Sequence, residues 1–161
     1  MISKPRHDEA YVWVWLPDAT QPVVAGRLAR DGDGLIFNYG RRYLELEGAI
    51  PLYLPELPLR TGAIPPEPGL NMAGCLRDGA PDAWGRRVIL NRTFGIKGED
   101  ADIGAIDELT YLLESGSDRI GALDFQLSPT RYVPRSVQPA PRAELRTAAE
   151  QVPRANPPPP D

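Results

Sequence analysis

The chain has 161 residues, which is enough for one domain with a modest hydrophobic core. Its 18 basic and 22 acidic residues give a net charge of −4, which argues against a domain whose main task is to bind a nucleic-acid backbone directly. The single cysteine excludes an intrachain disulfide framework, and no apolar run approaches the roughly 18 residues that cross a bilayer. Because the N-terminus carries no secretory signal, we expect a soluble cytoplasmic protein.

The first third of the chain predicts an antiparallel meander of three strands. Residues 1–10 are polar, and we expect them to be frayed. Runs of β-forming residues at 11–16, 23–28 and 35–39 predict strands. Their connections are short, which favours antiparallel pairing. The turn 31–34 has the sequence Asp-Gly-Asp-Gly, whose glycines can take positive φ.

A proline-rich stretch follows at residues 50–69. Proline fixes φ and removes a backbone donor, so this stretch is predicted to be extended chain or an edge strand and not a helix. Its prolines alternate with apolar residues, and we therefore expect it to lie on the body of the protein.

Helical signals begin near Leu70. A short helix is predicted at 71–77, and a longer one starts with Pro81 in its first turn and runs to about Phe94, with Gly95 as its C-cap. Within the longer helix, two adjacent apolar stripes are predicted; their members are Ala83, Leu90 and Phe94 on one, and Trp84 and Val88 on the other.

A third helix is predicted at 103–114, with Asp102 as its N-cap, and a closing strand at 120–127. The fold class is therefore α+β: a small antiparallel sheet or partial barrel, then two to three helices and a closing strand.

Beyond residue 133 the composition changes. Residues 134–161 hold eight prolines and neither an aromatic residue nor a glycine. Such a segment buries too little apolar surface to offset the entropy lost on ordering, so we expect a largely disordered linker or tail. The predicted folded domain spans 11–133.

The search for catalytic chemistry predicts no catalytic residue, metal ligand or cofactor. The only histidine, His7, falls in the expected frayed tail, and Cys75 lies among apolar residues and is predicted to be a buried, inert thiol. No histidine and cysteine cluster has zinc spacing, and no glycine-rich phosphate loop is present. The triplet at 124–126 is Asp-Phe-Gln and not the kinase Asp-Phe-Gly, and we interpret it as strand alternation.

Two groups of residues remain as candidates for function. The first is the helix start at 81–88, where Trp84 belongs either to the core or to a partner interface. Its neighbours Arg86 and Arg87 are interpreted as a solvated face. The second is the polar loop at 115–122, which is either a simple helix-to-strand turn or part of the same interface.

In this order and spacing the sequence resembles the N-terminal subdomain of HipA-type serine/threonine kinases, the toxins of HipBA toxin–antitoxin modules. The resemblance covers roughly 11–133. It is carried by Leu-Arg-Asp-Gly-Ala-Pro-Asp-Ala-Trp-Gly-Arg-Arg-Val-Ile-Leu, ending at Leu90, and by Glu-Leu-Thr-Tyr-Leu-Leu-Glu-Ser-Gly-Ser-Asp-Arg-Ile-Gly-Ala-Leu, ending at Leu123.

The resemblance implies a domain that is not an enzyme by itself, because the family's phosphate loop, ATP-contacting Lys, catalytic Asp and metal-binding Asp have no matching positions here. It implies protein partners, namely a HipA-like kinase core, a HipB-like helix-turn-helix antitoxin, or both, with no direct nucleic-acid, membrane or small-molecule ligand. The candidate partner interface consists of Trp84, Arg87, Val88, Asp118 and Arg119.

Three arrangements are compatible with this reasoning. The chain is a fragment or a truncated gene product of a full HipA-like kinase, or a separately encoded, antitoxin-like small subunit of a split kinase, or an unrelated binding module with the same β-then-α outline. The proline-rich tail, which resembles a link to a kinase core, favours the first arrangement.

Overall fold

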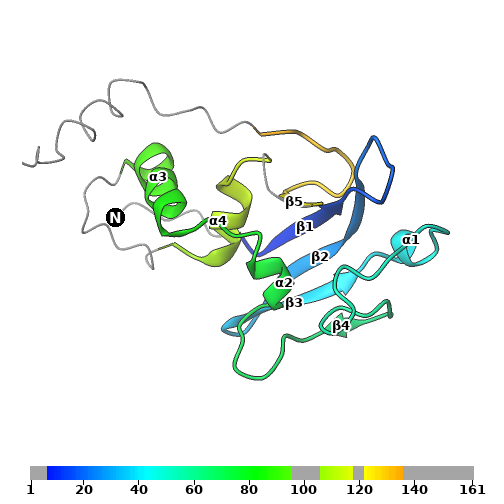
Figure 1. The fold of residues 1–161 in the computed structure, drawn as a ribbon. Coiled ribbons are helices and arrows are strands. Elements are labelled where there is room, and N and C mark those ends of the chain that lie inside the picture. Colours follow the sequence, from blue (N-terminus) through cyan, green and yellow to red (C-terminus); the bar gives the residue numbers. More distant parts are fainter. Residues whose placement is uncertain (1–6, 96–105, 118–121, 136–161) are drawn as a thin grey trace, which may run out of the picture.

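The computed structural model describes residues 7–95, 106–117 and 122–135. Within these residues the chain forms one five-stranded antiparallel sheet with four helices around it (Figure 1). The strands are β1 (Glu9–Val14), β2 (Val23–Asp31), β3 (Gly34–Tyr39), β4 (Ala63–Ile64) and β5 (Leu123–Gln126). The helices are α1 (Arg41–Leu44), α2 (Gly74–Arg77), α3 (Ala83–Phe94) and α4 (Glu108–Glu114).

The strand order is β4-β3-β2-β1-β5, and each neighbouring pair is antiparallel. The predicted α+β class is confirmed, and the sheet is open, with β4 and β5 at its edges. The predicted closing strand is β5, which returns to pair with β1 and so joins the chain's late residues to its first strand.

The predicted meander is confirmed, with a tight turn and one irregularity. Gly32 takes φ +58° in the two-residue connection between β2 and β3, as the turn sequence predicts. A β-bulge shifts the β1–β2 register between Val12 and Trp13. Next to it, Gly26 lies so close to β3 that an added Cβ would come within 2.2 Å of the Asn38 carbonyl oxygen. Only glycine fits this position.

The prediction that residues 1–10 are frayed is wrong for its last residues. β1 begins at Glu9, and Ala10 is fully buried opposite Leu28. Even His7 is held, because its carbonyl oxygen accepts a hydrogen bond of 2.9 Å from Arg30 Nη2. The sequence understated this strand because its first residues are polar, while their backbone groups pair with β2.

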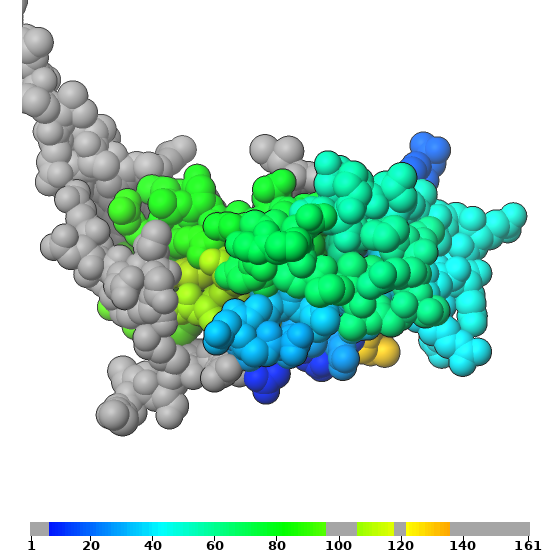
Figure 2. Space-filling model, turned by 90° about the horizontal axis from the view of Figure 1, so that it is seen from below, coloured from blue at the N-terminus to red at the C-terminus, as the bar shows by residue number. Residues whose placement is uncertain are grey.

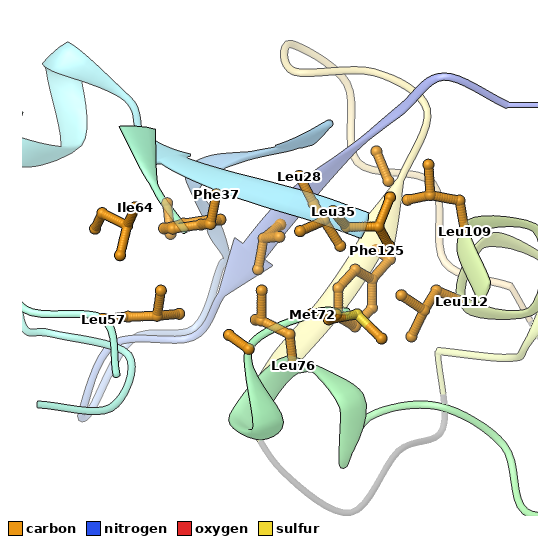
Figure 3. Packing of buried hydrophobic residues seen from close by; sticks show 14 of the residues in the cluster. Leu28, Leu35, Phe37, Leu57, Ile64, Met72, Leu76, Leu109, Leu112 and Phe125 are labelled. Atoms are coloured by element: carbon orange, nitrogen blue, oxygen red, sulfur yellow. The ribbon is translucent and has the colours of Figure 1, made fainter. Parts of the chain in front are cut away.

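The main core lies on one face of the sheet (Figure 3). Leu28, Phe37 and Phe125 project from three strands toward the side chains of α2, α4 and the proline-rich stretch. The residues that cover them include Leu57, Ile64, Met72, Leu76, Leu109 and Leu112. The burial of this apolar surface is the main force that holds the sheet and helices together.

The proline-rich stretch packs on the body, as predicted. The Tyr39 hydroxyl donates to the Leu57 carbonyl oxygen and accepts from Leu52 N at 2.9 Å, so one buried tyrosine fastens two points of the stretch. β4, at its far end, is the predicted edge strand. Figure 2 shows residues 50–70, coloured teal to green, as part of a continuous surface beside the β2–β3 hairpin.

Two predicted helices are shorter than expected. α2 covers only Gly74–Arg77, and α4 begins at Glu108, where the Asp107 side chain accepts a hydrogen bond of 2.9 Å from Thr110 N. This N-cap contradicts a helix that starts at residue 103 and continues through 107. The expected cap, Asp102, lies outside the described residues.

Residues 128–135, which we call the C-terminal strap, cover the opposite face of β1 and β5. The Tyr132 ring contacts Trp13 and Trp15, with centroids 5.5 and 5.2 Å apart, and Trp13 Nε1 donates to the Ser128 carbonyl oxygen. Arg135 is held as well, two residues past the predicted end of the domain. The packed chain therefore continues at least to Arg135.

Candidate protein interface

α3 carries three of the five candidate interface residues, and the local sequence explains its bounds. The Asp82 side chain accepts a hydrogen bond of 2.8 Å from Gly85 N, which satisfies a free donor of the first turn. Gly95 takes φ +67° and ends the helix, so the predicted C-cap is confirmed. Pro81 precedes the cap and does not sit in the first turn as predicted.

α3 packs on α4 through a small apolar cluster of its own. Ile89 and Leu90 are buried against Ile106 and Tyr111, and Phe94 packs at the margin. Of the predicted stripe formed by Ala83, Leu90 and Phe94, Leu90 is buried in this cluster whereas Ala83 is exposed. Helical spacing alone identified two stripes, but the position of α4 decided which residues face inward.

Arg86 contributes a polar contact to the same helix pair. Its guanidinium donates two hydrogen bonds to the Glu108 carboxylate, at 2.8 and 2.9 Å, and lies 4.5 Å from the centroid of the Tyr111 ring. The hydrogen bonds to Glu108 raise the pKa of Arg86, so the guanidinium stays charged. The interpretation of Arg86 as a solvated face is wrong: 17% of its side chain is exposed.

Trp84 lies on the opposite side of α3, and 67% of it is exposed. Of the two alternatives left open for Trp84, burial in the core is therefore excluded. The indole borders an apolar groove of about 140 Å³ between α3 and the end of α4. The groove is lined by Pro81, Trp84, Gly85, Val88, Ile89, Arg92, Glu114, Ser115 and Gly116.

The structure brings together part of the predicted interface. Val88 is half-buried and lines the groove next to Trp84, while Arg87 is exposed on the same helix. Asp118 and Arg119 lie outside the described residues. The loop that leads to them begins at the groove, because Ser115 and Gly116 form part of its wall.

α3 lies at the end of the molecule away from α1 and β4 (Figure 1). It contacts α4, and it also contacts Ile106 before that helix and Pro81 before its own first turn. A large, exposed aromatic side chain beside an apolar groove is typical of protein-binding surfaces.

Sequence reasoning missed a buried carboxylate on β5. Asp124 is 0% exposed, accepts from Tyr132 Oη at 2.8 Å and from Phe125 N at 2.8 Å, and forms an ion pair of 2.9 Å with Arg135. Burial raises its pKa, but the hydrogen bonds from Ser117, Tyr132 and Gln126, together with the charge of Arg135, lower it further than burial raises it. An aspartate inside an apolar strand was the available signal. This carboxylate fastens the C-terminal strap and is already saturated with donors.

Cys75 is half-buried at the start of α2. The Glu56 carboxylate accepts from Gly74 N and Cys75 N, both at 2.9 Å, and so caps this short helix. Burial, together with the hydrogen bond to Glu56 and its charge, raises the pKa of the Cys75 thiol to about 12. The thiol is therefore protonated at neutral pH and unsuited to nucleophilic chemistry, in line with its prediction as inert.

Among the described residues, no group of three or more histidine, cysteine, aspartate or glutamate side chains is placed to hold a metal ion. In the same part of the chain, no helix is long and apolar enough to cross a membrane.

The fold and its exposed groove define an α+β domain in which an open antiparallel sheet carries a peripheral helix pair. The chain belongs to the HipA N-terminal domain family, whose model matches residues 13–126. Comparison with curated proteins gives no match. The family match covers the end of β1, strands β2 to β5 and the four described helices, and it is to the N-terminal domain of HipA and not to a kinase core.

Proposed function

We propose that this chain is a non-catalytic, cytoplasmic N-terminal subdomain of a HipA-family toxin–antitoxin kinase, and that it acts through contacts with a HipA-like kinase core, a HipB-like antitoxin, or both. Membership of the HipA N-terminal domain family supports this reading and argues against an unrelated binding module. The single observation that carries the proposed interface is Trp84, a tryptophan left 67% exposed beside an apolar groove.

The proposed contact surface consists of Trp84, Arg87 and Val88 on α3, with Asp118 and Arg119 in the loop that follows the groove. Tryptophan and arginine are enriched among the residues that dominate binding energy at protein interfaces. The ion pair between Arg86 and Glu108 holds α3 in one orientation, so the surface is formed before a partner arrives.

The direct test compares Trp84→Ala with Leu54→Ala. Leu54 is the matched control because it is 66% exposed and lies in the proline-rich stretch, outside the groove. Titration calorimetry of each variant against a purified HipA-like kinase core, and separately against a HipB-like antitoxin, measures the dissociation constant. We expect Trp84→Ala to weaken binding to at least one partner by about 30-fold, which corresponds to about 2 kcal/mol, and Leu54→Ala to leave it unchanged.

Because Trp84 is exposed, both variants are expected to keep the circular dichroism spectrum of the parent. Equal affinities for the parent and a folded Trp84→Ala chain would contradict the proposed interface.

The alternative arrangement is a separately encoded, antitoxin-like subunit of a split kinase. Such a subunit would use the same surface, but its contact would restrain a separate kinase subunit. If the chain restrains a separate kinase subunit, then adding it to that subunit lowers phosphoryl transfer in proportion to occupancy. If it is part of the kinase itself, then the kinase needs it covalently attached for full activity.

The non-catalytic part of the proposal has its own measurement. The isolated chain, incubated with labelled ATP and Mg²⁺, should neither retain nucleotide nor incorporate phosphate. Incorporation of label would contradict it directly.

A further inference from the structure

Part of the wall of the groove beside Trp84 is not helical. Ser115 and Gly116 line the groove, and Ser115 is the C-cap of α4, with φ −71° and ψ 151°. The chain therefore leaves the helix at Ser115 in an extended conformation. Ser115 N still donates to the Tyr111 carbonyl oxygen at 3.1 Å. Beyond that bond the helix ends, so the position of the wall depends on contacts with other segments of the chain.

The next residue, Ser117, is bonded to the end of the C-terminal strap in both directions. Arg135 N donates to Ser117 Oγ at 2.9 Å, and Ser117 N donates to the Arg135 carbonyl oxygen at 2.7 Å. In Figure 1 the end of the strap, in orange, lies beside the loop after α4. The groove wall is thus held by α4 on one side and by the strap on the other.

The contact between Ser117 and the strap is anchored on a buried carboxylate. Asp124 is 0% exposed, and it accepts hydrogen bonds from the Arg135 guanidinium at 2.9 Å and from the Ser117 side chain. Arg135 also donates to the Phe125 carbonyl oxygen. The Ser117 hydroxyl therefore accepts from one partner and donates to another. Hydrogen bonds to a charged group are stronger than neutral ones, so this attachment is firm.

A wall that is fixed in advance matters for binding. A partner that meets a preformed surface does not bear the entropy cost of ordering it. If the strap were released, Ser115 and Gly116 would have to be ordered when the partner binds, and the affinity would fall. By linkage, a partner that binds the ordered wall stabilises the attachment of the strap by the same factor.

We propose that Ser117 and Arg135 are positioning residues for the partner surface beside Trp84. The strap holds the groove wall in its binding shape, so binding in the groove and attachment of the strap stabilise each other. The role in binding rests on the proposed function, whereas the link between the strap and the wall is a property of the chain alone. The strap, residues 128–135, follows the stretch 13–126 that the family model matches.

The test compares Ser117→Ala with Ser128→Ala. Ser128 is the matched control because its hydroxyl also accepts from main-chain donors of the strap, Thr130 N and Arg131 N, both at 3.1 Å, while it does not line the groove. Each variant thus removes one hydroxyl acceptor from the strap. Ser117→Thr keeps the hydroxyl and serves as the conservative rescue.

The first measurement needs no partner. Amide hydrogen exchange, followed by nuclear magnetic resonance of the whole chain, reports the Ser115 N–H that is bonded to Tyr111 in the groove wall. We expect this amide to exchange about tenfold faster in Ser117→Ala, and at the parent rate in Ser128→Ala and Ser117→Thr. An unchanged rate in Ser117→Ala, or equal increases in the two alanine variants, overturns the proposal.

The second measurement is titration calorimetry against the same HipA-like kinase core and HipB-like antitoxin as for Trp84→Ala. We expect Ser117→Ala to weaken binding by at least about fivefold for the partner that Trp84→Ala affects, and the other two variants to bind like the parent. If Trp84→Ala weakens binding and Ser117→Ala does not, the positioning role is wrong while the proposed function stands. If Trp84→Ala changes nothing, the proposed function fails, and the exchange rates alone decide whether the strap holds the wall.

Discussion

The guanidinium of Arg86 and the carboxylate of Glu108 meet through two parallel hydrogen bonds of 2.8 and 2.9 Å, and this pair joins α3 to α4 across 22 positions of sequence. The two side chains are 17% and 28% exposed, so water screens the pair only partly. The helix that presents Trp84 is held on α4 by this ion pair, by a small apolar cluster, and by hydrogen bonds from Arg92 and Thr93 to Glu114.

Arg86→Lys should destabilise the domain. Lysine keeps the charge but cannot make two parallel hydrogen bonds to one carboxylate, and it stacks less well on the Tyr111 ring. We expect the free energy of unfolding, measured in urea, to fall by about 1 kcal/mol. Arg87→Lys, on the exposed side of the same helix, should change it by less than about 0.5 kcal/mol. Equal losses of unfolding free energy in the two variants would show that the ion pair between Arg86 and Glu108 does not stabilise the domain.

Asp124→Asn should weaken the attachment of the C-terminal strap. The variant loses a charged acceptor and leaves Arg135 without its ion pair, so we expect a loss of about 2 kcal/mol at pH 7. The matched control is Asp31→Asn, at the exposed end of β2.

The pH dependence of that loss has a definite sign. The hydrogen bonds and the Arg135 charge hold the pKa of Asp124 below its ordinary value of 3.8 in the folded state. Its contribution is therefore fully present above about pH 4 to 5 and is lost as the pH falls toward the folded pKa. Urea unfolding at pH 7, 5 and 3 measures the free energy of unfolding of the parent and of Asp124→Asn. The difference between the two should become smaller only at pH 3. A gap that stays constant down to pH 3 would be inconsistent with this linkage.

Tyr39→Phe should loosen the proline-rich stretch. The variant removes the donor to the Leu57 carbonyl oxygen and the acceptor for Leu52 N, and we expect a cost of about 1–3 kcal/mol. Tyr53→Phe is the control, since half of Tyr53 is exposed. Thermal unfolding followed by circular dichroism measures both.

Burial raises the pKa of Tyr39 to about 12, against 10.0 in the unfolded chain. The neutral hydroxyl is thus favoured by folding, and its contribution is complete below pH 10 and lost between pH 10 and 12. The stability difference between the parent and Tyr39→Phe should shrink over that window, and no such change should occur between pH 7 and 9.

Cys75 should react slowly with a disulfide reagent in the folded protein. With a pKa of about 12, against an ordinary value of 9.0, the thiolate fraction at pH 8 is about 1,000-fold lower than for a free cysteine. Glu56→Gln removes the neighbouring charge and should speed the reaction, whereas Glu47→Gln, at an exposed position, should not. If Cys75 reacts with the reagent as fast in the folded protein as in urea, the prediction of a protected thiol is wrong.

Much of the local structure was predictable because it depends on residues close together in the sequence. The glycine turn at Gly32, the C-cap at Gly95 and the β-rich runs of the meander all behave as their local chemistry predicts. The predictions failed where a distant partner decided the outcome. β1 starts at Glu9 because β2 supplies the pairing, and Arg86 turns inward because Glu108 on α4 accepts its hydrogen bonds. The start of α4 is a local exception, since the helix begins at Glu108 where Asp107 caps it.

From the sequence, the candidate interface was predictable only as one of two alternatives, with Trp84 either in the core or at a partner interface. Two adjacent apolar stripes on one helix cannot both face α4, and the sequence does not say which one does. The packing of Ile89 and Leu90 on α4 rotates Trp84 outward and brings Arg86 in toward Glu108.

By itself, the sequence determined the α+β outline, the family resemblance and the identity of the helix that carries Trp84, because these follow from short-range patterns and from their order along the chain. Only the tertiary structure decided that Trp84 is exposed, that Arg86 is paired and that Asp124 fastens the strap beside the groove. Each of these depends on contacts between residues far apart in the sequence or on burial behind distant elements, and no local pattern encodes such contacts.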